Sequence, residues 1–201
     1  MKIIVIGGTG TIGKAVVKEL AQRHEVIVAG YKDGDINVNI ADKKSIEAMY
    51  KSMSNIDAVI ATTGTVHFGK LAEMKEDDYY LGLKSKLMGQ INLILLGLPY
   101  INDAGSFTLT SGILNHDPII LGSSAAMVNG AIDGFVKSAA LEMPRNIRIN
   151  SISPTVITES MDIYAPYFRG FVSISSAQAA LAYSKSVEGA QTGQIYKVGY
   201  L

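Results

Sequence analysis

The stretch KIIVIGGTGTIG, residues 2–13, decides the fold. Its apolar run at residues 3–6 is typical of a buried strand, and a helical pattern, AVVKEL, follows at residues 15–20. Between them lie the glycines at positions 7, 8, 10 and 13. Glycine permits a tight turn and close backbone approach, and the amides that begin a helix attract negative charge. The order of strand, glycine-rich turn and helix therefore predicts a site for a nucleotide pyrophosphate, with an ordinary glycine-rich turn as the alternative.

The composition indicates one globular domain over residues 1–201, because 48% of the residues are hydrophobic and only 18% are charged. The chain has no cysteine, which excludes disulfides and thiolate chemistry. A net charge of zero without a long basic run argues against a nucleic-acid partner. The longest apolar stretch, residues 91–98, is too short to span a bilayer, and the N-terminus does not resemble a signal peptide. We expect a cytoplasmic protein with no metal site and no membrane partner.

Predicted strands and helices alternate along the rest of the chain. Strands are predicted at residues 25–29, 36–40, 56–61, 106–110, 148–154 and 194–198, and helices at 43–52, 76–84, 85–102, 123–142 and 177–186. Asp42 is the predicted N-cap of the helix that begins at residue 43. The alternation predicts an α/β fold: a doubly wound, Rossmann-type three-layer sandwich with a mostly parallel sheet of about seven strands. A ligand would bind at the carboxyl ends of the strands.

The end of the strand at residues 25–29 bears on the choice of cofactor. In NAD-binding units an acidic residue about 20 residues past the glycines binds the ribose 2′-hydroxyl. Here the strand is followed by Gly30-Tyr31-Lys32, with no carboxylate at its tip. Lys32 would instead attract a 2′-phosphate, which favours NADP over NAD. The alternative is a solvated turn lysine whose charge Asp33 and Asp35 offset.

Five further motifs follow the glycines Gly7, Gly10 and Gly13 in order. They are Ala61-Thr62-Thr63-Gly64, Ser111 after the predicted fifth strand, Ala140-Leu141-Glu142 at the end of the long helix, Arg148-Ile149-Asn150-Ser151-Ile152-Ser153-Pro154, and Thr192-Gly193-Gln194. With these motifs the chain resembles the short-chain dehydrogenase/reductase family along nearly its whole length.

The resemblance implies a set of residues that bind the cofactor, NADP more readily than NAD. The amides of residues 9–12 would bind the pyrophosphate, Asn39 and Ile40 would flank the adenine, and residues 62–64 would line the ribose. Val156 and Thr158 would approach the nicotinamide amide. The expected cofactor-binding residues are Gly7, Thr9, Gly10, Thr11, Ile12, Gly13, Tyr31, Lys32, Asn39, Ile40, Thr62, Thr63, Gly64, Pro154, Val156 and Thr158.

The catalytic residues of the family are mostly replaced. Alignment backwards from Glu142 puts the family's tyrosine on Ala125 and its lysine on Asn129, while its asparagine falls on Lys86. Only the serine, Ser111, remains. Lys86 is a candidate to return the cation that Asn129 removes, or else it is simply an exposed lysine.

Two further features near this site have both a functional and a structural interpretation. His116 is a candidate proton donor, since histidine titrates near neutral pH, or else a solvated turn residue. The aromatic residues Tyr164, Tyr167 and Phe168 either cap the pocket or pack on the surface.

These observations predict an NADP(H)-binding oxidoreductase that acts on a small carbonyl or alcohol compound with atypical proton-transfer residues. The alternative is a catalytically silent NADP(H)-binding protein that senses redox state or regulates a partner, and a third is a fold whose dinucleotide site is empty. A polar-lined cavity with Lys86 or His116 pointing into it would favour the enzyme, and a filled cavity would favour the sensor. In relatives the helices corresponding to residues 85–102 and 123–142 pack against their symmetry mates, so we expect a homodimer or homotetramer.

Overall fold

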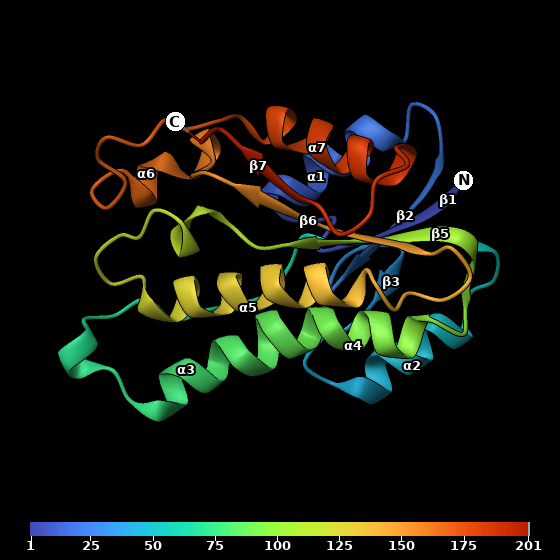
Figure 1. Ribbon diagram of the computed structural model, residues 1–201, viewed down its shortest axis with the longest axis horizontal. Helices are drawn as coiled ribbons and strands as arrows, with labels where there is room; N and C mark the ends of the chain where they lie inside the picture. Colours follow the sequence, from blue (N-terminus) through green and yellow to red (C-terminus); the bar gives the residue numbers. More distant parts are fainter. Residues whose placement is uncertain (201) are drawn as a thin grey trace.

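The computed structural model describes residues 1–200, and its centre is one seven-stranded sheet (Figure 1). The strands lie in the order β3-β2-β1-β4-β5-β6-β7, and each pairs in parallel with its neighbours. Their bounds are β1 Lys2–Ile6, β2 Glu25–Gly30, β3 Ile36–Asn37, β4 Ile56–Ala61, β5 Ile101–Thr110, β6 Arg148–Pro154 and β7 Ile195–Val198. The predicted doubly wound, Rossmann-type parallel sheet is confirmed.

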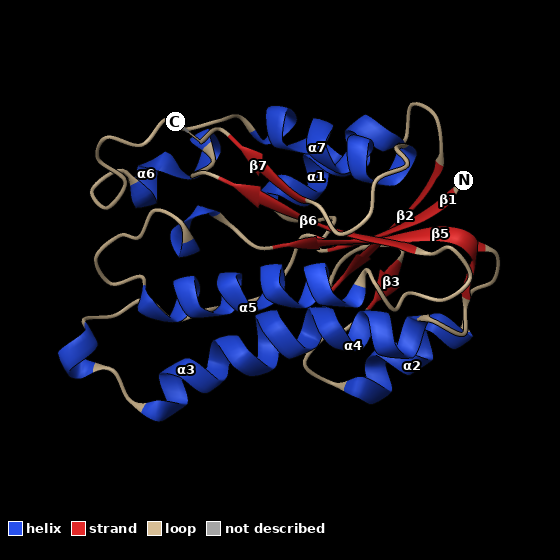
Figure 2. Cartoon of the chain, in the orientation of Figure 1, coloured by secondary structure: helices blue, strands red, loops and turns tan. Residues whose placement is uncertain are grey.

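Helices cover both faces of the sheet, as Figure 2 shows. On one face lie α1 (Thr11–Leu20) and α7 (Ser176–Glu188), and on the other α2 (Lys43–Lys51), α3 (Glu76–Gly82), α4 (Met88–Gly97) and α5 (Ser123–Ala139). Short turns labelled η1 (Leu71–Glu73), η2 (Leu83–Leu87), η3 (Ile113–Asn115) and η4 (Thr158–Ser160) and the short helix α6 (Met161–Tyr164) complete the elements. The direction of winding reverses between β1 and β4, so the carboxyl ends of these strands form the crevice where open α/β sheets bind ligands.

The side chains of β1 show how the two cores form. Successive residues of a strand point to opposite faces, so an apolar run is buried on both sides. Ile3 and Val5 pack with Val16 and Leu20 of α1. Ile4 and Ile6 belong instead to the core beneath α2, α4 and α5. The continuous apolar run therefore supplies both layers of the sandwich.

The two helices predicted at residues 76–84 and 85–102 form one continuous helical run, which ends earlier than predicted. Residues 76–97 form one helical run in which η2 is a π-helical turn, where the backbone amide of Met88 donates to the carbonyl of Leu83. Such π turns are frequent at functional sites. The run ends at Gly97 and not at Asn102, because Ile101 pairs with Ile56 as the first residue of β5.

Other boundaries differ by a few residues. The third strand ends at Asn37 and not at residue 40, because the side chain of Asn39 accepts from the amide of Ala41 and turns the chain towards α2. The long helix α5 ends at Ala139 and not at residue 142. Asp42 is the N-cap of α2 as predicted, with its carboxylate accepting from the amide of Lys44 at 3.0 Å. No helix formed by residues 1–200 is long and apolar enough to cross a membrane.

Candidate cofactor and active site

The glycine-rich turn packs directly onto the first helix. A Cβ atom on Gly13 would lie 2.0 Å from the carbonyl oxygen of Gly7, so only glycine lets α1 approach the turn this closely. Gly10 is the N-cap of α1, and no side chain caps the helix there. The first amides of a helix have no partner within it, so this N-terminus presents hydrogen-bond donors to an anion.

A cavity of about 440 Å³ opens beside this turn. It is formed by the ends of β1, β2 and β4, by the chain after β3 and by Ser85 of η2. Its lining includes many of the predicted cofactor residues: Gly7, Thr9, Gly10, Tyr31, Asn39, Ile40, Thr62, Thr63 and Gly64. The structure therefore brings the glycine turn and the end of β2 to one hollow.

A second cavity, of about 270 Å³, adjoins the first and shares Thr62, Thr63 and Gly64 with it. Its mostly apolar walls come from the ends of β5 and β6, from α5 and from Phe168. The predicted residues in its lining are Ile12, Lys86, Ser111, Ala125, Asn129, Pro154 and Val156. All of the positions at which the resemblance placed catalytic residues therefore meet in one cavity.

Lys86 is held in this cavity by two acceptors. Its Nζ donates to the backbone carbonyl of Ser111 at 2.9 Å and to Oδ1 of Asn129 at 2.8 Å. The amide nitrogen of Asn129 donates in turn to the carbonyl of Gly112 at 3.2 Å. Burial lowers the pKa of Lys86 to about 8, and the negative charge of Asp133 partly offsets this lowering.

The position of Lys86 depends on a close backbone contact. Gly64 has a φ of +127°, and a Cβ atom there would lie 2.6 Å from the Cα of Lys86. The turn after β4 can therefore lie directly against η2, which brings the lysine to the edge shared by the two cavities.

Ser111 is 3% exposed and follows β5. Its amide donates to the carbonyl of Ile152, and its Oγ lies 3.1 Å from Oγ of Ser151 on β6. Ser151 Oγ is also 3.3 Å from a carboxylate oxygen of Asp133. The serine is thus connected to a buried carboxylate on α5.

Some predicted residues lie outside the two cavities. Thr11 and Gly13 form the first turn of α1, Lys32 is exposed beside Tyr31, and the hydroxyl of Thr158 donates to Ser173. His116 does not share a cavity with Lys86 but lines a separate hollow of about 210 Å³.

The aromatic residues Tyr164, Tyr167 and Phe168 do not all lie at the pocket. Phe168 is 7% exposed and lines the second cavity. Tyr164 packs against it with ring centroids 6.2 Å apart, whereas Tyr167 is 40% exposed. Only part of the cluster therefore covers the pocket.

The sequence analysis missed Asp133, Ser151, Asn115 and Thr155, which surround the predicted residues. Asp133 lies four residues after Asn129 on α5, and that spacing places both on one face of a helix. The four-residue spacing is the feature of the sequence that could have identified Asp133 as a neighbour of Asn129. Over residues 1–200, no three His, Cys, Asp or Glu side chains gather as a metal site would require.

Comparison with known proteins agrees with this geometry. The family model described as enoyl-(acyl carrier protein) reductase matches residues 4–192. The protein lin1944 from Listeria innocua is 50% identical, with 98% of each chain covered and a TM-score of 0.96. A small-chain dehydrogenase solved in complex with NADPH is 27% identical, with 98% of this chain and 96% of that chain covered and a TM-score of 0.88. Carbonyl reductase family member 4 from Xenopus tropicalis is 26% identical over 180 residues, which are 79% of this chain and 76% of that protein.

The chain belongs to the short-chain dehydrogenase/reductase family, an oxidoreductase family.

Proposed function

We propose that this protein is an NADP(H)-dependent oxidoreductase that interconverts a small carbonyl compound and its alcohol, with Lys86 as the proton donor in the direction of reduction. The observation that carries the proposal is the position of the Lys86 amine, in the same cavity as Ser111 and fixed by two hydrogen bonds. The related dehydrogenase in complex with NADPH and the related carbonyl reductase support the choice of cofactor and reaction.

The residues of the two cavities fit a dinucleotide. The uncapped N-terminus of α1 would hold the pyrophosphate, and the shared residues Thr62–Gly64 let one extended ligand occupy both cavities. Tyr31 lines the first cavity and Lys32 follows it, so Lys32 would meet a 2′-phosphate. When bound, NADPH supplies the hydride.

Lys86 has the proton-donating capacity that the reaction needs. A lysine ammonium group has three N–H donors, and the carbonyl of Ser111 and the side chain of Asn129 take two of them. The remaining donor is available to a substrate oxygen. With a pKa of about 8, the group is mostly protonated at neutral pH yet acidic enough to release its proton.

The cavity walls indicate the substrate class. Val66, Phe68, Leu114 and Phe168 make most of the lining apolar, and Ala125 leaves room where a tyrosine would project. Lys86 and Ser111 supply polar groups at one side. We therefore infer a small, largely apolar aldehyde or ketone whose oxygen lies between these two residues.

Calorimetric titration with NADPH and, separately, with NADH tests the cofactor, and oxidation of NADPH in the presence of a panel of small aldehydes and ketones tests the reaction. We expect binding of NADPH in preference to NADH, and turnover that Lys86→Ala loses and Lys84→Ala keeps, because Lys84 is an exposed neighbour on the same turn. Binding without turnover on any carbonyl would favour a silent NADP(H)-binding protein. A folded sample that binds neither nucleotide would overturn the proposal.

A further inference from the structure

Asp133 is a buried carboxylate that the reaction described above does not yet use. It lies on α5 and is 5% exposed. Ionised side chains are rarely buried to this extent unless other groups compensate their charge. The neighbours of its Oδ2 atom are Nδ2 of Asn115, which donates to it at 2.8 Å, and Nε2 of His116, which lies 3.7 Å away.

The other carboxylate oxygen faces the active site through Ser151. The Ser151 hydroxyl lies 3.3 Å from Oδ1 of Asp133 and 3.1 Å from Oγ of Ser111. One hydroxyl has one hydrogen, so Ser151 donates to Asp133 or to Ser111, and not to both at once. An ionised Asp133 competes for this hydrogen, because a charge-assisted hydrogen bond is the stronger of the two. The Ser151 oxygen then remains free to accept from the Ser111 hydroxyl, so Ser151 bridges the carboxylate and Ser111 and fixes the position of that serine.

Asp133 also acts on Lys86 by charge. Burial lowers the pKa of Lys86 to about 8, and the negative charge of Asp133 partly offsets this lowering. The other titratable groups that face Asp133 are His116 and Tyr200, whose rings pack at 5.8 Å. Burial raises the pKa of Tyr200, and its hydroxyl is paired with Ser153 at 2.6 Å.

We propose that Asp133 is a positioning residue for the reaction: its contact with Ser151 fixes the position of the Ser111 side chain at the substrate oxygen, and its buried negative charge stabilises the ammonium group of Lys86. This inference rests on the proposed function in its reference to substrate. The effect of Asp133 on Lys86 is a property of the protein alone.

The test compares Asp133→Asn with the charge-matched control Glu47→Gln. Asparagine keeps the shape of the side chain but removes the charge, and its single oxygen can accept from Asn115 or from Ser151, in place of two carboxylate oxygens. Glu47 lies on α2 with 45% of its side chain exposed, where solvent screens the same change in charge. The first readout is the titration of Lys86 by NMR on lysine-labelled protein, which requires no turnover, and the second is the pH dependence of carbonyl reduction.

In Asp133→Asn we expect Lys86 to titrate at a lower pH than in the wild type. Turnover should fall at both pH values because the contact with Ser151 is weakened, and the fall should be at least about threefold larger at pH 8 than at pH 6, where the amine remains protonated. Glu47→Gln should match the wild type in both readouts. An unchanged Lys86 titration in folded Asp133→Asn would overturn the electrostatic part of the proposal.

Ser151→Ala tests the second contact without a change to Asp133, and it does not depend on the folding of Asp133→Asn. The charge of Asp133 remains, so Lys86 should titrate as in the wild type while turnover falls equally at pH 6 and pH 8. Wild-type turnover at both pH values would overturn the link to Ser111. If the protein binds no NADPH but the titration shift in Asp133→Asn is present, the proposed function fails and the influence of Asp133 on Lys86 stands.

Discussion

The side chains of Lys86 and Asn129 meet at 2.8 Å, joining the π-helical turn η2 to α5 at the wall of the second cavity. The resemblance to the family placed its asparagine on Lys86 and its lysine on Asn129. By that resemblance the contact joins the same two residue types in exchanged positions, with the cation supplied by η2 and not by α5.

Replacement of this amine should remove most of the activity. In Lys86→Met the apolar stem remains and the proton donor is lost, so we expect carbonyl reduction to slow by about 10²- to 10⁴-fold. NADPH titration should still show binding, because the glycine turn and the first cavity are unchanged. Lys84→Met is the matched control, and a comparable loss of activity there would show that the effect is not specific to the site.

The pH dependence of reduction should show an alkaline limb near pH 8. Reduction requires the ammonium form, and the pKa of Lys86 is lowered to about 8 by burial. The rate should therefore be flat below this pH and fall about tenfold per pH unit well above it. Steady-state rates across the range check this expectation. An alkaline limb that persists unchanged in the residual activity of Lys86→Met would assign it to another group.

The same shift in pKa makes stability depend on pH. The folded-state pKa of Lys86 lies near 8, below the value of 10.5 expected without burial. Between these values the unfolded chain binds more protons than the folded chain, so the free energy of unfolding should rise with pH through that window. Urea unfolding at pH 8 and pH 10, compared between wild type and Lys86→Met, isolates the effect, because the buried tyrosines are common to both. An equal pH dependence in the two proteins would contradict it.

Lys32 should determine the preference between the two nicotinamide cofactors. Lys32→Ala removes the exposed cation beside Tyr31, so NADPH should bind about 10- to 100-fold more weakly while NADH binding changes little. Lys18→Ala, at the far end of α1, serves as the control for loss of a surface charge. Equal weakening of both cofactors by Lys32→Ala would mean that the lysine does not read the 2′-phosphate.

The sequence predicted the sheet and the cofactor crevice because both depend on local patterns. The run Ile3–Ile6 has the length and composition of a doubly buried strand, and Gly7 and Gly13 mark a backbone contact that other residues could not make. In contrast, the end of α4 was predicted too late, although Gly97 and Pro99 are residues that commonly mark the end of a helix. The pairing of Ile101 with Ile56 shows that the chain has already entered the next strand there.

The residues that meet in the second cavity were predicted by alignment, but the charges around them were not. Lys86, Ser111 and Asn129 could be located by their order along the chain. The role of Asp133 depends on its burial and on its distance to Ser151, which is remote from it in sequence. Such contacts between separate elements have no sequence period by which to recognise them.

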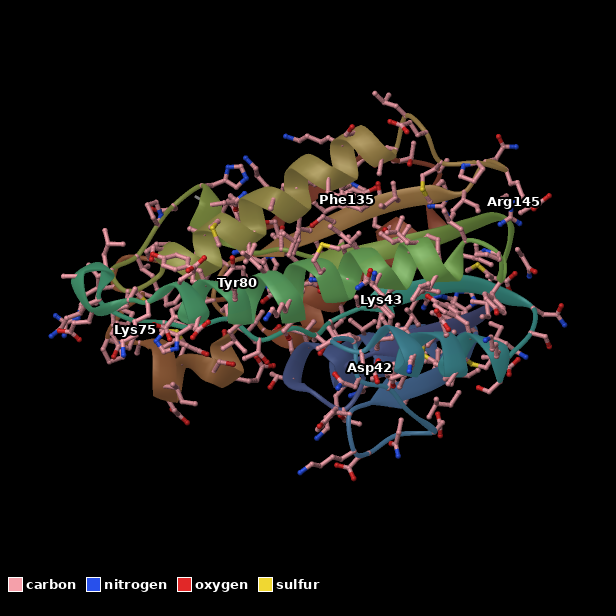
Figure 3. The ribbon with its side chains drawn as sticks, turned by 90° about the horizontal axis from the view of Figure 1, so that it is seen from below. Asp42, Lys43, Lys75, Tyr80, Phe135 and Arg145 are labelled. Atoms are coloured by element: carbon pink, nitrogen blue, oxygen red, sulfur yellow. The ribbon has the colours of Figure 1, made fainter. Side chains whose placement is uncertain are left out.

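The surface of α3, α4 and α5 that faces away from the sheet predicts how copies of this chain associate. In Figure 3 the run from α3 to α4 lies in front beside α5, with Tyr80 and Phe135 labelled on these helices. Both helices carry exposed apolar side chains. On α4, Met88 is 40% and Leu95 is 56% exposed, and on α5, Met127 is 40% exposed. Glycine and alanine residues on the exposed side of α5 would let a second helix approach closely.

We therefore expect a homodimer or homotetramer that packs through α4 and α5, and light scattering on the purified protein measures its mass. Leu95→Asp should shift the protein towards the monomer without loss of folding, because the side chain is already exposed and a buried carboxylate would oppose only the assembly. Ile163→Asp, a similar change at a 70% exposed position on α6, should leave the mass unchanged. A monomeric wild type would contradict the assembly itself, whereas an intact oligomer in Leu95→Asp would move the interface away from α4.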